Sequence, residues 1–209
     1  MTDPTPGLAD AYAIRSPDDN RRVYAAWAAS YDTGFAAGMG YRLPGLVADA
    51  YAMAGGTGPV LDLGAGTGLV AAALARHGIG PVDATDISAE MLAQARGKGL
   101  YRALFVADAG AALPLGNGSF SGVVSAGTFT HGHLGPAALA EVLRIIAPGG
   151  LAVLSINAGH YAAQGFADAL AALSARFTLR HQTTEAIYAR TADHAHAADT
   201  AVIVTLRRV

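Results

Sequence analysis

Apolar residues in the first quarter of the chain recur at the period of a helix. Val23, Trp27 and Tyr31 are four residues apart, so their side chains lie near one face of a helix. Ser16 and Pro17 are typical of an N-cap and of a first helical position, respectively. We therefore expect a helix that begins at Pro17 and carries an aromatic stripe.

Along the rest of the chain, short apolar runs alternate with helical patterns. We expect helices at 43–54, 67–77, 88–98, 136–147 and 161–175, and strand-like runs at 60–63, 82–85, 104–107, 122–126, 151–156, 177–189 and 201–208. Strands and helices that alternate in this way are typical of βαβ units, which place a parallel sheet between two layers of helices. The last two runs lack an intervening helix and depart from that pattern.

The composition is that of a folded protein in water. Of the 209 residues, 52% are hydrophobic and 14% are charged, which argues against disorder and against a coiled coil. No apolar run approaches the roughly 20 residues that cross a bilayer. The first ten residues, MTDPTPGLAD, lack the basic and apolar regions of a signal peptide. We expect a soluble, cytoplasmic protein with no membrane partner.

Charge and cysteine content exclude further classes of function. The chain has no cysteine, which removes disulfides, thiolate zinc sites and cysteine nucleophiles. Its net charge is −2, and its arginines are scattered rather than gathered in a basic stripe. Since nucleic-acid binders usually carry such a stripe, we do not expect DNA or RNA as a partner.

Residues 60–68, VLDLGAGTG, form the most informative motif. An expected strand runs into Gly64, Gly66 and Gly68, and a helical pattern follows. Glycines allow a sharp turn and let a ligand lie against the backbone, so this arrangement predicts a nucleotide site. A dinucleotide site needs G-x-G-x-x-G, but the third position is Leu69. Asp62 suits an ammonium group better than a pyrophosphate, which favours a nucleoside with a cationic tail.

Four further motifs follow in an order that resembles the class I S-adenosylmethionine-dependent methyltransferases. VLDLGAGTG resembles their motif I. ATDIS places Asp86 where that family binds ribose hydroxyls, and FVADA places Asp108 where it binds the adenine amino group. FSGVVSAGTF (120–129) resembles the fourth-strand motif, although Ser121 replaces its usual aspartate, and LRIIAPGGLAVLSI (143–156) resembles the helix-PGG-strand motif.

The resemblance implies both a fold and a reaction. Residues 23–47 resemble the cap of a subgroup similar to the Williams–Beuren-region methyltransferase-like proteins. We expect a Rossmann-like, doubly wound α/β fold, with seven strands of which the last is antiparallel, helices on both faces and an N-terminal helical lid. The implied reaction is direct in-line transfer of a methyl group from S-adenosyl-L-methionine to a small-molecule acceptor.

The expected organisation is one methyltransferase domain at 17–209 after a flexible N-terminal arm at 1–16. Pro4, Pro6 and Gly7 are the loop signals that suggest the arm. The three expected parts of the domain are the lid (17–56), the cofactor-binding half (57–158) and the C-terminal strands on the substrate side (159–209).

The glycine motif and the resemblance together give a set of cofactor-binding candidates. They are Tyr24, Tyr31, Asp62, Gly64, Ala65, Gly66, Thr67, Gly68, Asp86, Ile87, Met91, Asp108, Ala109 and Ser125. Asp86 and Asp108 could instead be turn or capping carboxylates, yet both follow expected strands, where open α/β sheets bind ligands. Ile87 and Met91 flank the adenine or simply pack. An aromatic stripe such as Tyr24–Tyr31 is usually core, but a ring can also contact the sulfonium.

Candidates for the acceptor side follow the fourth and fifth expected strands. His131 and His133 lie where the resemblance places the transferred methyl group, and His131 is the first candidate for a general base. The alternative is that these histidines only shape the pocket. Tyr31 is a second catalytic candidate. The remaining candidates for substrate contact are Asn157, His160 and Arg42. We expect no metal, because the His-x-His pair has no nearby carboxylate.

Other functions compete with methyl transfer. A protein that binds S-adenosylmethionine or S-adenosylhomocysteine without catalysis would carry the same motifs. An NAD(P)-dependent oxidoreductase is disfavoured by Leu69, and a hydrolase by the lack of a G-x-S-x-G elbow and of cysteine. The acceptor and the oligomeric state stay open at this point.

Overall fold

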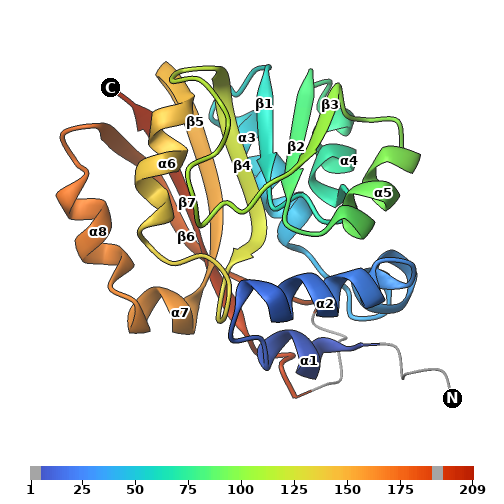
Figure 1. Ribbon diagram of the computed structural model, residues 1–209. Coiled ribbons are helices and arrows are strands. Elements are labelled where there is room, and N and C mark those ends of the chain that lie inside the picture. The colour runs from blue at the N-terminus through green and yellow to red at the C-terminus, as the bar shows by residue number, and fades with distance from the viewer. Residues whose placement is uncertain (1–5, 190–194) are drawn as a thin grey trace, which may run out of the picture.

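The computed structural model describes residues 6–189 and 195–209. Its centre is a seven-stranded sheet in the order β3-β2-β1-β4-β5-β7-β6 (Figure 1). The strands are β1 (Val60–Leu63), β2 (Val82–Asp86), β3 (Ala103–Val106), β4 (Phe120–Phe129), β5 (Ile146–Asn157), β6 (Phe177–Ala186) and β7 (Thr200–Arg208). Strands β1 to β5 run parallel, whereas β7 is antiparallel to both neighbours. The expected Rossmann-like, doubly wound α/β fold is confirmed.

Helices cover both faces of the sheet (Figure 1). They are α1 (Leu8–Tyr12), α2 (Pro17–Trp27), the π-helix η1 (Tyr31–Ala37), α3 (Leu43–Met53), α4 (Leu69–Arg76), α5 (Ala89–Gly97), α6 (Ala138–Ile145), α7 (Ala158–Ala163) and α8 (Phe166–Ala172). Successive strand residues point to opposite faces. Val123 of β4 accordingly joins a core with α6 and α8, and the next residue, Val124, joins a core with α3 and α4.

The signals at helix starts predict one boundary correctly and place another two residues too early. The Ser16 hydroxyl accepts a hydrogen bond from the backbone N–H of Asp19 at 3.1 Å, and α2 begins at Pro17 as expected. Helix α4, in contrast, begins at Leu69 rather than at residue 67. Gly68 has a left-handed backbone with φ of 90°, so the glycine turn extends two residues further before the helix can start.

Two other boundaries correct the sequence-based expectation. The Pro-Gly-Gly segment does not close a helix that reaches residue 147, because α6 ends at Ile145 and the segment lies within β5. The pairing of β4 with β5 shifts there, from Phe120 opposite Ile146 to Gly122 opposite Leu151, which accommodates the extra residues as a bulge. The single helix expected at 161–175 is two short helices, α7 and α8, which Gly165 separates with φ of 70°.

Helices α1 and α2 lie across the carboxyl ends of the strands (Figure 1), whereas α3 packs with α4 on one face of the sheet. We keep the name lid for residues 17–56. Within 1–16, the segment expected to be a flexible arm, the described residues include helix α1 and the buried Ile14. The flexibility of this arm stays a prediction. No helix within 6–189 and 195–209 is long and apolar enough to cross a membrane.

Candidate functional site

A cavity of about 470 Å³ lies between the carboxyl ends of β1, β2 and β4 and the lid. Its volume is within the range of small-molecule sites, roughly 300–1,000 Å³. The expected site residues that line it are Tyr24, Tyr31, Gly64, Ala65, Gly66, Thr67, Asp86, Ile87, Met91, Asp108, Ala109 and His133. The structure therefore brings together the lid, the glycine turn and the ends of three strands.

The three glycines of the turn have different surroundings. A Cβ on Gly64 would lie 2.2 Å from the Thr128 hydroxyl, and one on Gly68 would lie 2.9 Å from the Tyr101 ring. A Cβ on Gly66 would meet no atom within 4 Å among the residues described. Since Gly66 lines the cavity, its missing side chain leaves room for a ligand, whereas Gly64 and Gly68 leave room for neighbouring side chains.

Asp86 ends β2 with its carboxylate at the floor of the cavity. Its Oδ2 accepts a hydrogen bond from the Gly66 N–H at 2.8 Å, and its Oδ1 accepts one from the Ser88 N–H at 2.9 Å. Burial raises the pKa of this carboxyl, and the backbone N–H donors partly oppose the rise. The carboxylate thus holds the glycine turn in place, and its further lone pairs are available to hydroxyl donors.

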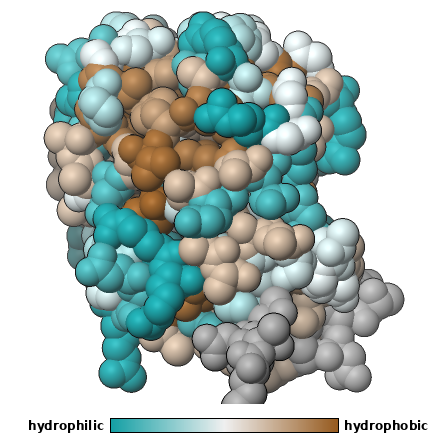
Figure 2. Space-filling model, turned by 45° about the vertical axis from the view of Figure 1, so that its right-hand side comes forward, coloured by the Kyte–Doolittle hydropathy of each residue, from teal (hydrophilic) through white to brown (hydrophobic). Residues whose placement is uncertain are grey.

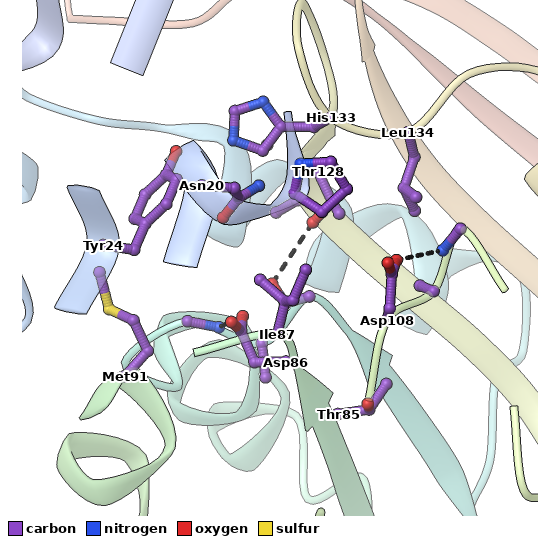
Figure 3. A pocket seen from close by; sticks show the side chains of 18 of the residues that line it. Asn20, Tyr24, Thr85, Asp86, Ile87, Met91, Asp108, Thr128, His133 and Leu134 are labelled. Carbon is purple, nitrogen blue, oxygen red and sulfur yellow. Dashed lines mark hydrogen bonds between the residues drawn. The ribbon is translucent and has the colours of Figure 1, made fainter. Parts of the chain in front are cut away.

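Asp108 and the residues around it form the far side of the same cavity (Figure 3). The Asp108 carboxylate follows β3 and accepts a hydrogen bond from the Gly110 N–H at 2.8 Å, as an aspartate does in an Asx turn. Ile87 and Met91 line the cavity, and Met91 is also buried in the core at 1% exposure. Met91 therefore both lines the cavity and packs in the core.

Asp62 and Ser125 are buried away from this cavity. Tyr101 donates a hydrogen bond to Asp62 Oδ2 at 2.6 Å, and Oδ1 has no hydrogen-bond partner within the described part of the chain. Burial raises the pKa of Asp62 to about 7. Ser125 donates to the Leu63 carbonyl at 2.7 Å and so joins β4 to β1. Asp62, Ser125 and Gly68 are not among the described residues that line the cavity, and they lie on the opposite side of the glycine turn.

Asp32 connects the lid to the glycine turn. The Thr67 hydroxyl donates to Asp32 Oδ1, and the Lys98 ammonium donates to Asp32 Oδ2 at 2.6 Å and to the Thr67 carbonyl. Asp32 lies in the π-helix η1. Helices of this type are rare in proteins, and those that occur are often found at functional sites. One carboxylate of the lid is therefore bound to a residue that lines the cavity.

Sequence reasoning missed several residues of the cavity wall. Asn20 lies one turn before Tyr24 on α2 and is buried at 9% exposure (Figure 3). Its spacing from Tyr24 was the signal that could have identified it, because residues four apart share a helix face. Arg15, Tyr41 and Thr128 also line the cavity. Tyr41 and Thr128 lie within segments that resemble family motifs, but nothing in the local sequence distinguishes them from their neighbours there.

A second, smaller cavity of about 70 Å³ adjoins the first. It shares Tyr24, Tyr31, Tyr41, Gly127 and His133 with the first cavity. Much of its remaining wall is aromatic or apolar, and the other expected site residues there are His131 and Asn157. The two cavities thus meet at a ring of tyrosines and one histidine.

The loop after β4 places the two expected histidines differently. His133 Nδ1 lies 2.8 Å from the carbonyl oxygen of His131, and His133 Nε2 is buried with no hydrogen-bond partner among the described residues. Burial lowers the pKa of His133, and the nearby His160 lowers it further, whereas the His131 carbonyl opposes this. His131 is an exposed residue whose ring centroid lies 5.2 Å from that of His160.

His160 and Arg42 are not among the described residues that line either cavity. His160 is buried, and its Nε2 lies 3.0 Å from the Leu134 carbonyl. Arg42 is exposed and donates to the Ala186 carbonyl at 3.2 Å. Within 6–189 and 195–209, no group of three or more histidine and acidic side chains could hold a metal ion.

The sequence of this chain is similar to that of known methyltransferases. A family model described as a methyltransferase domain matches residues 60–150. Human methyltransferase-like protein 27 is 35% identical over 150 residues, which make up 69% of this chain. The match spans 60% of the human protein's own length.

Solved structures agree in fold. A structure described as an S-adenosylmethionine-dependent methyltransferase from Mesorhizobium loti matches with a TM-score of 0.53 and 19% identity over 71% of this chain and 90% of its own. The [4+2]-cyclase SpnF matches with a TM-score of 0.67 and 18% identity over 93% of this chain and 97% of its own. At such identities the similarity concerns the fold alone.

Proposed function

The chain belongs to the class I S-adenosylmethionine-dependent methyltransferases, and from this premise we propose that it transfers a methyl group to a small-molecule acceptor by direct in-line transfer. The observation that carries the proposal is the 470 Å³ cavity, in which Gly66 leaves open space beside the Asp86 carboxylate. Both features stand at the carboxyl edge of the sheet, where open α/β folds bind ligands.

The residues of the cavity suit S-adenosylmethionine. The backbone at Gly66, which carries no side chain, offers open space for the methionine part, and Asp86 offers acceptors for the two ribose hydroxyls. Asp108, Ala109, Ile87 and Met91 would enclose the adenine. Tyr24 and Tyr31 on the lid offer ring faces to a cation.

When bound, this cofactor supplies a methyl group on a sulfonium, which is already a good leaving group. The protein therefore has to position the acceptor and exclude water. Positioning alone contributes up to ~7–11 kcal/mol in model reactions. The lid, which Asp32 joins to Thr67 and Lys98, is the element that covers the cavity.

The acceptor would enter from the second cavity. This cavity adjoins the first through Tyr24, Tyr31, Tyr41 and His133, so a molecule in it reaches the same space. Its small volume, about 70 Å³, favours a small molecule or a narrow end of a larger one. Tyr31 and His131, the expected catalytic candidates, both line it.

Calorimetric titration with S-adenosylmethionine, S-adenosylhomocysteine and NADH tests the proposed cofactor. We expect micromolar binding of the first two and no binding of NADH. Binding of NADH alone would instead support an oxidoreductase. Binding of S-adenosylmethionine with no methylated product from any acceptor would support the non-catalytic alternative.

A further inference from the structure

The hydrogen bond of His133 fixes which of its ring nitrogens carries the proton. Its Nδ1 lies 2.8 Å from the carbonyl oxygen of His131, and a carbonyl oxygen only accepts. Nδ1 therefore donates, and in the neutral ring the lone pair is on Nε2. That Nε2 is buried and has no hydrogen-bond partner within 6–189 and 195–209. A buried acceptor without a partner is costly and calls for an explanation.

The position of His133 suggests that a ligand supplies the missing donor. His133 is one of the residues that line both cavities, and its ring packs edge-on against Tyr24, with centroids 5.6 Å apart. Figure 3 shows His133 on the lid side of the cavity with Asn20 and Tyr24, opposite Asp86, Ile87 and Met91. A molecule that spans the junction of the cavities would meet this ring.

The wall of the second cavity limits the charge of that molecule. Among its described lining residues there is no lysine, arginine, aspartate or glutamate. Aromatic side chains, including Tyr12, Trp27, Phe129 and Tyr188, form much of it. A charged acceptor would lose its hydration there and find no counter-ion, which is unfavourable. A neutral, flat, apolar molecule loses little and gains contact with the rings.

We propose that His133 is the general base of the reaction, and that the acceptor is a neutral aromatic molecule whose O–H or N–H donates to His133 Nε2. The proposal rests on the proposed methyl transfer and specifies its acceptor. It also assigns to His133 the role that the sequence alone suggests for His131.

The step balances with this chain's own residues and the two reactants. The acceptor oxygen or nitrogen uses a lone pair to form the bond to the methyl carbon. The bond between that carbon and sulfur breaks, and its electron pair stays on sulfur, which becomes neutral. The acceptor's proton moves to His133 Nε2, and the resulting imidazolium keeps its Nδ1–H bond to the His131 carbonyl.

The surroundings of His133 keep it neutral and ready to accept a proton. Burial is the main cause of its lowered pKa. The titratable groups that face it are His131 in its own loop, His160 of α7 and the Tyr24 hydroxyl of α2. None of these is an acid that would hold the imidazolium charged in the free protein.

Nuclear magnetic resonance on the wild-type protein with bound S-adenosylhomocysteine is the first test. Long-range ¹H–¹⁵N correlation distinguishes the histidine tautomers and gives the pH at which each ring titrates. We expect His133 to carry its proton on Nδ1 at pH 7.5 and to have a pKa below the ordinary histidine value. A proton on Nε2, or a charged ring at pH 7.5, would overturn the assignment of the base.

Turnover of a defined panel is the second test. The panel contains phenol, catechol and aniline as neutral acceptors, and 4-hydroxybenzoate as the matched anion. We expect S-adenosylhomocysteine to form with the neutral compounds and more slowly by at least about tenfold with the anion. Preference for 4-hydroxybenzoate, or no turnover of any neutral compound, would overturn the acceptor class.

The variant His133→Asn tests the proton-accepting Nε2 separately from the hydrogen bond that Nδ1 makes. Asparagine can keep a donor near the Nδ1 position and removes Nε2. We expect turnover to fall by ~10²–10⁴-fold, with unchanged affinity for S-adenosylhomocysteine and loss of the acid limb of the pH profile. His181→Asn, on exposed β6, is the control. Retained turnover in His133→Asn would overturn the role of His133, whereas failure of the wild type to bind S-adenosylmethionine would count against the proposed function itself.

Discussion

Lys98 and Asp32 form an ion pair of 2.6 Å between the C-terminal end of α5 and the lid. Lys98 also donates to the Thr67 carbonyl, so the pair includes the glycine turn. Both side chains are about one-third exposed or less. The pair therefore connects the lid to the glycine turn, and both of these border the cavity.

Loss of this pair should loosen the lid. In Asp32→Asn we expect affinity for S-adenosylmethionine to fall by up to about fivefold, since partly exposed ion pairs are worth ~0.2–1 kcal/mol. The melting temperature should change little. Asp18→Asn is the matched control, because Asp18 pairs with Arg21 on the exposed face of α2. Calorimetry on the two variants and the wild type would reject this role of Asp32 if all three bind alike.

A side chain at Gly66 should block the cofactor. Gly66→Arg is expected to abolish binding of S-adenosylmethionine, because any side chain there enters the open cavity. The substitution also strains a backbone with φ of 54°. Gly99→Arg controls for that strain, since Gly99 has a similar φ of 66°. A Cβ added to Gly99 would meet no described atom within 4 Å, and the residue follows α5, away from the cavity. Equal binding in the two variants would remove Gly66 from the site.

Removal of the Asp86 carboxylate should weaken binding strongly. Hydrogen bonds to a charged group are worth ~1.5–3 kcal/mol, so we expect Asp86→Ala to bind S-adenosylmethionine about 10- to 100-fold more weakly. Part of this loss would come from the Gly66 and Ser88 N–H groups that Asp86 holds. Asp83→Ala, in the same strand but paired with Arg102, is the control. Unchanged affinity in Asp86→Ala would show that the residue serves only the turn.

Asp62 should make the stability of the fold depend on pH. Burial raises its pKa to about 7 in the folded protein, against 3.8 as the ordinary value. Between these values the folded state binds the extra proton, so this residue's contribution to stability is full below about pH 4 and is lost as pH rises through about 7. At pH 8 the raised pKa of Asp62 lowers the free energy of unfolding by at most ~4 kcal/mol relative to pH 4.

Asp62→Asn should remove that dependence. We expect the variant to be more stable than the wild type at pH 8 and similar to it at pH 4, as measured by chemical denaturation. Asp168→Asn, at an exposed position in the first turn of α8, is the matched control for the loss of one carboxylate. The idea fails if the wild type and Asp62→Asn lose the same stability between pH 4 and pH 8.

The sequence predicts those features that local chemistry determines. Ser16 and Pro17 set the start of α2 because a cap acts within four residues. Asp86 and Gly66 are recognisable because the spacing between a strand end and a glycine turn is fixed by the sheet. The order of strands and helices follows from the same alternation, and the structure confirms it.

Features that depend on distant partners escape sequence reasoning. Asp62 is interpreted as a ligand for an ammonium group, but the structure pairs it with Tyr101, 39 positions later in the chain. Asn20 becomes part of the cavity only because the lid crosses the strands. The tautomer of His133 depends on the carbonyl direction of His131, which no residue pattern encodes. The π-helix η1 likewise lacks a signature in its sequence.

The stretch from η1 to Tyr41 is held at both of its ends by different parts of the fold. Asp32 bonds to Thr67 of the glycine turn, whereas Tyr41 forms a β-bridge with Tyr188, which follows β6. Tyr31 and Tyr41, near the two ends of this stretch, each line both the larger and the smaller cavity. A ligand that orders this stretch from one side lowers the entropy cost for a ligand on the other side, so the two occupants should favour each other's binding by the same factor in both directions.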